Sequence, residues 1–405
     1  MTKLIHSLPL VSVTKPIRLK KDADRRIKAG HRWIFSNDID TSATPLKQYQ
    51  PGEWVVIENA MQNPIAIGYI NPHCLLCIRV ITRNVKNKID TEFFAKKMQH
   101  AKEKRELIYQ EPFYRAVFGD SDQLSGVVID RFDDVIVLQI NTAGMENQKT
   151  HLIDAIEKIF RPQAIYLKCD SAERTLEGLE HYQEAVKGPA PDNITIRENH
   201  CVFQAPLTTG QKTGWFYDHR DNRQRIAHYC KGKRVLDVFS YCGAFAIPCK
   251  KAGATEVIAI DRAQSALDFV LKNAAANALT NISTHCGDAE KILIELHNQK
   301  ELFDVVILDP PALIKRKKDQ SAGEKMYQRL NELALQLLRK NGILFSASCS
   351  MHLSAEDLQN GIRRAGIQTK RSLSILEQCH QAADHPVHPA IAETNYLKGF
   401  IVHAQ

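Results

Sequence analysis

The stretch RVLDVFSYCGAF, residues 234–245, decides how the second half of the chain folds. Its apolar residues Val235 and Leu236 lead to an acid, Asp237, and a helical pattern begins after a short turn that contains Gly243. This order predicts a buried parallel strand, a tight turn and a helix. An acid at the carboxyl end of such a strand, facing a helix N-terminus, lies where open α/β sheets bind their ligands.

The turn after this strand argues against a dinucleotide as the ligand. A pyrophosphate needs the glycines of G-x-G-x-x-G, whereas Ser240, Cys242 and Phe245 occupy the three positions here. S-adenosylmethionine (SAM) contains a nucleoside and an amino acid but no phosphate, so it makes no such demand. Asp237 would then face the amino group of SAM. The alternative is an ordinary buried turn with an incidental acid. The candidate cofactor residues of this stretch are Asp237, Phe239, Tyr241 and Gly243.

From Arg234 onward, strand and helix patterns alternate, which predicts a doubly wound, Rossmann-like α/β sheet. The expected strands are 234–239, 256–261, 282–287, 303–308, 342–348 and 398–404, and the clearest helices are 263–276 and 324–340. Asp261, next to Arg262, follows Asp237 by 24 residues, which is about the offset at which an acid contacts ribose hydroxyls. Asp288 ends the third strand and could accept from the adenine amine, although a helix N-cap is a strong alternative. Together these acids favour SAM as the ligand.

Two further domains are expected before this sheet. Residues 1–80 predict a small β-rich domain, with strands at 54–58, 65–70 and 75–81 separated by turn signals. Residues 81–200 predict an α+β domain, with helices over 90–110 and 149–160 and strands at 126–130, 135–140 and 164–168. Residues 201–405 would then form the domain of the doubly wound sheet, with a leading hairpin.

Composition limits the class of protein. The 405 residues carry a net charge of +8, a moderate excess that favours a polyanionic partner. No apolar run approaches the ~18 residues of a membrane span, and residues 1–16 lack the features of a signal peptide. We therefore expect a cytoplasmic protein without a membrane partner. Of ten cysteines, Cys74 and Cys77 form one CxxC inside an apolar run, which favours core packing over zinc, and no metal is expected.

The fourth strand of the sheet ends in Asp309-Pro310-Pro311. Because proline cannot extend a strand ladder, the chain leaves the sheet at Asp309, and this carboxylate would lie beside the transferable methyl group. Asp309 is therefore a candidate both for catalysis and for the cofactor site. The cations Lys315, Arg316 and Lys317 follow, and they suit a nucleic-acid phosphate better than an ordinary solvated loop.

The fifth strand ends in Ser-Cys349-Ser, the position of the candidate nucleophile. Carbon C5 of cytosine is a poor nucleophile, and addition of a thiolate to C6 converts C5 into an enamine-like carbon that can attack a methyl group. The alternative is that Cys349 is an ordinary small buried cysteine, but its position at the end of the strand that follows the D-P-P strand favours a catalytic role.

Several motifs resemble the RlmI-type family of 23S rRNA (cytosine-C5) methyltransferases. They are GHRWIFSN (30–37), GQKTGWFYDHRDNR (210–223), DVFSYCGAF (237–245), D-P-P, S-C-S and QAADHPV (381–387). The resemblance covers nearly the whole chain. It implies an N-terminal PUA-like RNA-binding β-barrel, SAM at Asp237, Asp261 and Asp288, and Cys349 as the nucleophile on a cytosine. One departure is Leu313, where the family usually carries phenylalanine, so stacking on a flipped base would be weaker or come from elsewhere.

The same resemblance raises the expectation that basic residues contact RNA. By themselves the cations of segment 15–28 suit a solvated helix face better. With the resemblance, 23S rRNA or a large-subunit precursor becomes the expected partner. In the 210–223 motif, Trp215 and Phe216 would add stacking surface. The candidate RNA contacts are Lys20, Arg25, Arg26, Lys212, Arg220, Lys315, Arg316 and Lys317.

Three alternatives remain open at this point. A methyltransferase acting on a guanine or adenine nitrogen would share D-P-P but need no cysteine, an assembly factor would bind RNA without catalysis, and a NAD oxidoreductase is disfavoured by the turn. The base that removes the C5 proton is not identified; His385 is a candidate, although a structural role suits it better. A homodimer is expected only as the common default.

Overall fold

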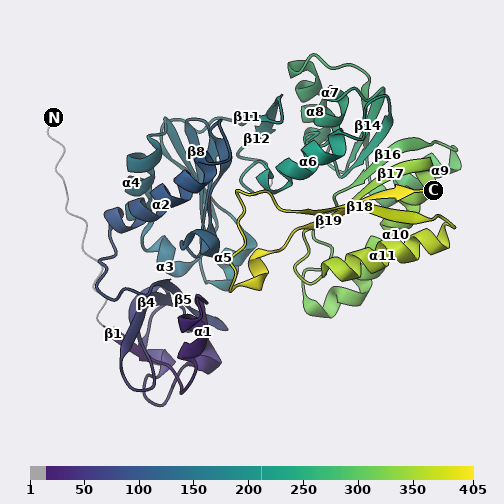
Figure 1. Ribbon diagram of the computed structural model, residues 1–405. Coiled ribbons are helices and arrows are strands. Elements are labelled where there is room, and N and C mark those ends of the chain that lie inside the picture. Colours follow the sequence, from purple (N-terminus) through teal and green to yellow (C-terminus); the bar gives the residue numbers. More distant parts are fainter. Residues whose placement is uncertain (1–14, 211) are drawn as a thin grey trace. The chain divides into compact units, whose positions relative to one another are not determined.

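The computed structural model describes residues 15–210 and 212–405, which form two compact units (Figure 1). Unit 1 holds the residues up to Asp192, together with 208–214 and Asp384–Thr394. Unit 2 holds Asn193–Leu207, Trp215–Ala383 and Asn395–Gln405. The chain thus crosses between the units five times. The expectation about a signal peptide concerns mainly residues 1–14, which lie outside the described residues, and the division into three domains stays a prediction.

The first sheet of unit 1 has five strands in the order β1-β3-β4-β5-β2. Strand β1 runs parallel to β3 and the other neighbours are antiparallel. The three strands expected from the sequence are present as β3, β4 and β5, whereas the short edge strands β1 and β2 were missed. The elements are β1 (Lys15–Arg18), α1 (Asp24–Lys28), β2 (Trp33–Phe35), β3 (Glu53–Glu58), β4 (Pro64–Ile70) and β5 (Leu76–Thr82).

The second sheet of unit 1 has the order β10-β9-β8-β7-β6, and only β8 and β9 run parallel. Helices α2 and α4 pack together, and their apolar side chains, among them Phe94 and Leu152, share one core with the strands. The elements are α2 (Thr91–Glu106), β6 (Phe113–Phe118), β7 (Val127–Phe132), β8 (Val135–Ile140), α3 (Ala143–Glu146), α4 (Lys149–Phe160), β9 (Ala164–Cys169), α5 (Ala172–Leu176) and β10 (Tyr182–Lys187). Strands β6 and β10, at the two edges, were not anticipated.

Unit 2 is built on a seven-stranded sheet in the order β15-β14-β13-β16-β17-β19-β18. The five strands from β15 to β17 are parallel, and β19 is antiparallel to both of its neighbours. The order turns at β13 and β16, so the carboxyl ends of these strands flank the switch point where ligands of such sheets bind. The strands are β13 (Arg234–Val238), β14 (Glu256–Asp261), β15 (Ile282–Cys286), β16 (Phe303–Leu308), β17 (Leu338–Ser348), β18 (Leu373–His380) and β19 (Lys398–Ala404).

Helices cover both faces of this sheet, as the continuous apolar character of its strands requires. Val235 and its neighbours pack against α6, α7 and α8, whereas Leu236 and its neighbours pack against α9, α10 and α11. The helices are α6 (Arg220–Ala227), α7 (Ala246–Lys251), α8 (Gln264–Ala276), α9 (Ala289–Asn298), α10 (Gln320–Leu337) and α11 (Ala355–Gln368); β11 (Asn193–Glu198) and β12 (Cys201–Pro206) form a hairpin. No helix in the described part of the chain combines the length and apolar character needed to cross a bilayer.

Candidate active site

Asp237 lies at the end of β13 and is completely buried. Its Oδ2 accepts a hydrogen bond of 2.9 Å from the backbone N–H of Ala246, the first residue of α7. Burial, together with the nearby carboxyls of Asp309 and Asp261, raises the pKa of Asp237 to about 8. The structure therefore brings these three acids together at the switch point.

Two buried oxygen atoms, one on Asp237 itself and one on Ser240, fit a polar ligand. Oδ1 of Asp237 and Oγ of Ser240 make no hydrogen bond within the described residues. Buried polar atoms are normally satisfied, so each calls for a partner that the protein does not supply. The cationic amino group of SAM is such a partner, because it would pair with the carboxylate and favour its charged form.

The turn that follows β13 has an unusual backbone. Phe239, Tyr241 and Gly243 all have positive φ, at 67°, 51° and 80°. Left-handed backbone is easy for glycine but costs energy at the two aromatic residues, and such strain collects at functional sites. Hydrogen bonds hold the turn in place, because Asp261 Oδ2 accepts from the Tyr241 N–H at 2.9 Å and the carbonyl of Cys242 accepts from Asn273 at 2.9 Å.

The other cofactor candidates lie at the neighbouring strand ends. Asp261 ends β14 and also accepts from the Ala263 N–H at 2.9 Å, so its carboxylate links two turns. Arg262 beside it is exposed. Asp288 is exposed and caps α9 through the Lys291 N–H at 3.2 Å, which is the alternative raised from the sequence. A cap leaves lone pairs on the carboxylate, so a contact with adenine stays a prediction.

Asp309, directly after β16, is oriented by a residue that the sequence did not reveal. His219 Nε2 lies 3.1 Å from Asp309 Oδ1, and His219 is nearly buried. The Asn222 side-chain amide lies 3.1 Å from both the His380 carbonyl oxygen and His219 Nδ1. Because a carbonyl only accepts, the amide nitrogen must donate to it, and Nδ1 then accepts as well. This assigns the proton to Nε2, which donates to Asp309.

Cys349 follows β17 and is half-buried, between two serines that anchor it. Ser348 Oγ donates to the Tyr327 hydroxyl at 2.8 Å, and the same hydroxyl lies 3.0 Å from Ser350 Oγ. Ser350 Oγ also accepts from the Ile314 N–H at 3.1 Å, in the loop that follows D-P-P. Since β16 and β17 are parallel neighbours, with Leu308 opposite Ser346, the loops of Asp309 and Cys349 leave adjacent strands and are tied together.

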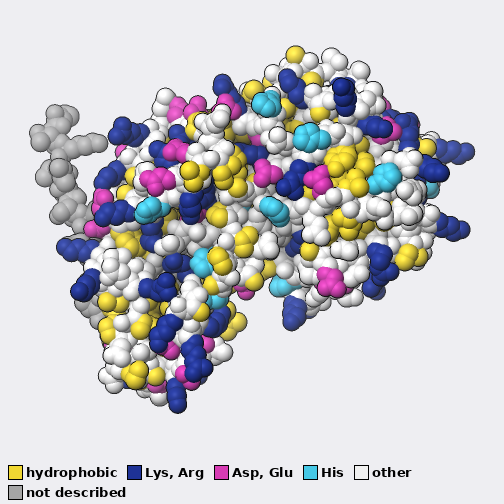
Figure 2. All heavy atoms as spheres, viewed as in Figure 1, with side chains coloured by type: hydrophobic (Ala, Val, Ile, Leu, Met, Phe, Trp, Pro, Cys, Tyr) yellow, Lys and Arg dark blue, Asp and Glu magenta, His cyan; other side chains and the backbone are white. Residues whose placement is uncertain are grey.

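The predicted RNA contacts differ in exposure. Lys20, Lys212, Lys315 and Lys317 are exposed, as are Arg25, which pairs with Asp22, and Arg316, which pairs with Asp319. Arg26 is exposed and lies over the Phe35 ring. Figure 2 shows Lys and Arg side chains standing out over the first sheet of unit 1. Leu313 is half-buried against the core under α10.

Two residues of the 210–223 motif are more buried than the sequence suggested. Trp215 is 1% exposed and donates from Nε1 to Glu198 at 3.0 Å, so the predicted stacking surface is wrong for this side chain. Arg220 is 8% exposed, with its Nε 3.5 Å from Glu198. Arg223 donates to the other oxygen of Glu198 at 2.7 Å. These contacts favour a structural role for Arg220, and its contact with RNA stays a prediction.

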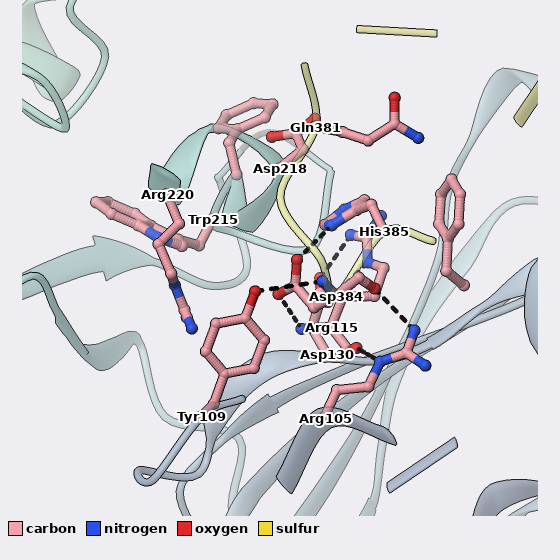
Figure 3. Close-up of polar contacts among 12 residues, drawn as sticks. Arg105, Tyr109, Arg115, Asp130, Trp215, Asp218, Arg220, Gln381, Asp384 and His385 are labelled. Atoms are coloured by element: carbon pink, nitrogen blue, oxygen red, sulfur yellow. Dashed lines mark hydrogen bonds and ion pairs between the residues drawn. The ribbon is translucent and has the colours of Figure 1, made fainter. Parts of the chain in front are cut away.

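The segment around His385 belongs to unit 1. Figure 3 shows the polar contacts of His385 and Asp384. His385 is 2% exposed, its Nδ1 lies 2.8 Å from Asp384 Oδ1, and its ring packs on Phe118. Arg105 donates to the Asp384 carbonyl at 2.7 Å, and the Arg115 N–H donates to Asp384 Oδ2 at 3.0 Å. We therefore favour the structural role for His385.

Comparisons with known proteins agree with this geometry. A family model for PUA-like domains matches residues 17–83, and one for S-adenosylmethionine-dependent methyltransferases matches residues 180–394, just over half of the chain. A structure from Streptococcus mutans, described as a SAM-dependent methyltransferase, has a TM-score of 0.81 at 21% identity and covers 96% of this chain and 100% of its own. At this identity the likeness concerns the fold alone.

Relatives named "Ribosomal RNA large subunit methyltransferase I" match almost the whole chain. The protein of Tolumonas auensis is 36% identical, covering 96% of this chain and 99% of its own, and that of Erwinia tasmaniensis is 34% identical with the same coverage.

The fold, the family model and the acids at the switch point define a SAM-dependent methyltransferase, with SAM as its cofactor. Within that class, the chain belongs to the family of the ribosomal RNA large subunit methyltransferases I.

Proposed function

We propose that this protein methylates ribosomal RNA of the large subunit in the cytoplasm, forming 5-methylcytosine in 23S rRNA through a covalent bond between Cys349 and C6. The observation that carries the proposal is the pairing of Asp309 and Cys349 on adjacent strand ends, locked together by Ser350. A nitrogen methyltransferase needs the acid but has no use for an anchored cysteine beside it.

Cys349 acts as the nucleophile. Its thiolate forms a bond to C6 while the C5=C6 electron pair moves onto C5, the carbon to be methylated. Once C5 carries the methyl group, a base removes the C5 proton, the C–H electron pair restores the C5=C6 bond, and the C6–S pair leaves with the thiolate. The serines on either side fix the backbone of Cys349, so attack does not require the loop to reorganise.

Asp309 binds the N3/N4 edge of the flipped cytosine and favours the protonated ring. His219 holds one of its oxygens, which leaves the other oriented for the base. Asp237 receives the amino group of SAM, Asp261 the ribose and Asp288 the adenine, with Phe239, Tyr241, Gly243 and Arg262 lining the same turns. Bound there, SAM supplies an electrophilic methyl group.

RNA is held by exposed cations. The candidates from the sequence are Lys20, Arg25, Arg26 and Lys212 in unit 1, and Lys315, Arg316 and Lys317 in unit 2. A cavity of about 530 Å³ in unit 1 adds another surface. Among the residues that the structure describes, its lysines Lys86, Lys88 and Lys96 form no ion pair, whereas its acids are engaged: Glu92 pairs with Lys158, and Asp122 with Arg105. Unpaired cations of this kind bind phosphates.

The experiment is incubation with methyl-labelled SAM and unmodified 23S rRNA, followed by nucleoside analysis. Wild type should place label in 5-methylcytidine, and Cys349→Ala should lose it by more than about 1000-fold while still binding SAM. Cys286→Ala is the matched control, because Cys286 is the exposed cysteine among those described and lies on β15. Label in a methylated guanosine or adenosine, unaffected by Cys349→Ala, contradicts the covalent mechanism. RNA binding without label indicates an assembly factor.

A further inference from the structure

Lys398, the first residue of β19, lies at the same strand end as Cys349. Strands β17 and β19 are antiparallel, and Lys398 stands opposite Ser348, the residue before Cys349. The side chain is half-buried. Nothing local in the sequence singles out this lysine, because 48 residues of chain separate it from Ser350.

The Lys398 ammonium group is held beside the nucleophile. Its Nζ donates to the Ser350 carbonyl, one residue after Cys349, and to the Tyr396 carbonyl at 2.9 Å. The backbone register and the side-chain bond thus fix Lys398 to the residues on both sides of Cys349. An ammonium group has three donors, and carbonyl oxygens take two of them.

The charges of the two side chains interact. Burial lowers the pKa of Lys398 to about 8, while its interaction with Cys349 acts in the opposite direction and favours the ammonium form. A pairwise interaction is reciprocal, so the ammonium ion favours the thiolate of Cys349 to the same extent. Thiolates stabilised by a neighbouring cation are the usual form of catalytic cysteines.

We propose that Lys398 is a positioning residue for the reaction, whose ammonium ion holds Cys349 as a thiolate before RNA binds. The proposal rests on Cys349 being the nucleophile of the proposed function. The thiol proton is released to solvent, and the sulfur lone pair then forms the bond to C6. When that bond breaks after methyl transfer, the electron pair returns to sulfur and the same ammonium ion again faces the thiolate.

A purely structural Lys398 would tie the end of β17 to β19 and leave the thiol unchanged. The two roles differ in the pH at which Cys349 becomes reactive, and this requires neither RNA nor SAM. Alkylation of the full chain by iodoacetamide follows the thiolate, and mass spectrometry of the Cys349 peptide separates it from the nine other cysteines.

In wild type, we expect the midpoint of Cys349 alkylation below the ordinary thiol value of about 8.5. Lys398→Gln should raise the midpoint by about one pH unit, which lowers the rate at pH 7 about tenfold. Lys398→Arg should restore most of the shift, since it keeps the charge. The matched control is Lys340→Gln, an exposed lysine on the same strand as Ser348, which should leave the midpoint unchanged.

An unchanged midpoint in a folded Lys398→Gln variant overturns the proposal. If that variant does not fold, the wild-type titration alone decides, because a midpoint at or above about 8.5 overturns it as well. The titration and the labelling experiment are separate measurements, so failure of this proposal is distinguishable from failure of the proposed function. A low midpoint without formation of 5-methylcytidine would support the thiolate and contradict the proposed reaction. A midpoint at or above about 8.5 with formation of 5-methylcytidine would support the reaction and contradict the role of Lys398.

Discussion

The polar groups of unit 2 and those of unit 1 are organised in opposite ways. Around Asp309 and Cys349, buried side chains are held by specific partners: His219 pairs with Asp309, and Tyr327 hydrogen-bonds with Ser350. Around the cavity of unit 1, Lys86, Lys88 and Lys96 are exposed, and within the described residues they form no ion pair. The chemistry of a methyl transfer depends on fixed geometry, whereas affinity for a polyanion depends on the number of charges. Single substitutions should therefore have large effects in the first region and small, salt-dependent effects in the second.

After the loss of label expected for Cys349→Ala, the largest effect is expected at Asp237. Replacing a buried carboxylate that pairs with a cation costs several kcal/mol, so Asp237→Asn should weaken SAM binding roughly 100-fold. Isothermal titration calorimetry measures this directly. The control is Asp288→Asn, at an exposed cap, which should lose less than about tenfold. Equal losses of SAM affinity in Asp237→Asn and Asp288→Asn would show that burial of the acid does not decide its contribution to binding.

The next effect concerns His219. A hydrogen bond to a charged group contributes about 1.5–3 kcal/mol, so His219→Ala should lower kcat about 10- to 100-fold. SAM affinity should not change, because His219 contacts Asp309 rather than Asp237. His219→Gln retains an N–H donor and should recover part of the rate. A variant that loses SAM binding together with activity would show that His219 supports the whole site instead.

The cavity of unit 1 should respond more weakly. Substituting Lys86, Lys88 and Lys96 together by Gln should lower RNA affinity about tenfold and reduce the slope of log K against log salt by roughly 2. Filter binding between 50 and 200 mM salt measures both. The charge-matched control replaces Lys231, Lys233 and Lys251, which are exposed beside the amino ends of the unit 2 strands. If both triple variants behave alike, net charge explains binding and the cavity is not a site.

A separate effect, on stability rather than on binding or rate, is expected again at Asp237. Its pKa is about 8 in the folded protein and about 3.9 when unfolded, so the folded state holds the extra proton between these values. Without ligand, its contribution to stability therefore falls as pH rises from 4 to 8, by on the order of 1 kcal/mol per pH unit at most. Asp237→Asn has no carboxyl group to titrate, so its stability does not fall in this way as pH rises. Calorimetry should show its Tm advantage over wild type growing from pH 5 to pH 8; a constant difference would contradict the assignment.

Much of unit 2 could be predicted because its signals are local. A buried strand followed by an acid marks Asp237, Asp261 and Asp309 without any knowledge of the partner strands. Strand β18 was missed because it lies at the sheet edge with most side chains exposed, and its apolar residues do not alternate strictly with polar ones. The expected helix over 324–340 ends at Leu337, since β17 already begins at Leu338.

The contacts that orient the site could not be predicted in this way. His219 lies far from Asp309 along the chain, and the two meet only because the sheet brings them together. Trp215 was expected to face RNA, but Glu198, which precedes it by 17 residues, provides a buried acceptor. A motif indicates which residues matter, and only the fold shows whether each one faces the ligand or another residue.

The docking of Asp384 in unit 1 has a consequence for how the chain is made. Asp384 binds the Arg115 N–H across 269 residues of sequence, and almost all of unit 2 is translated between them. Synthesis proceeds from the N-terminus at about 5–20 residues per second. After their synthesis, the Arg105 side chain and the Arg115 N–H therefore remain without their partner Asp384 for tens of seconds or less. During that interval the nascent unit 1 lacks the hydrogen bonds to Asp384, so a chain terminated before this residue would lack part of its first-made unit.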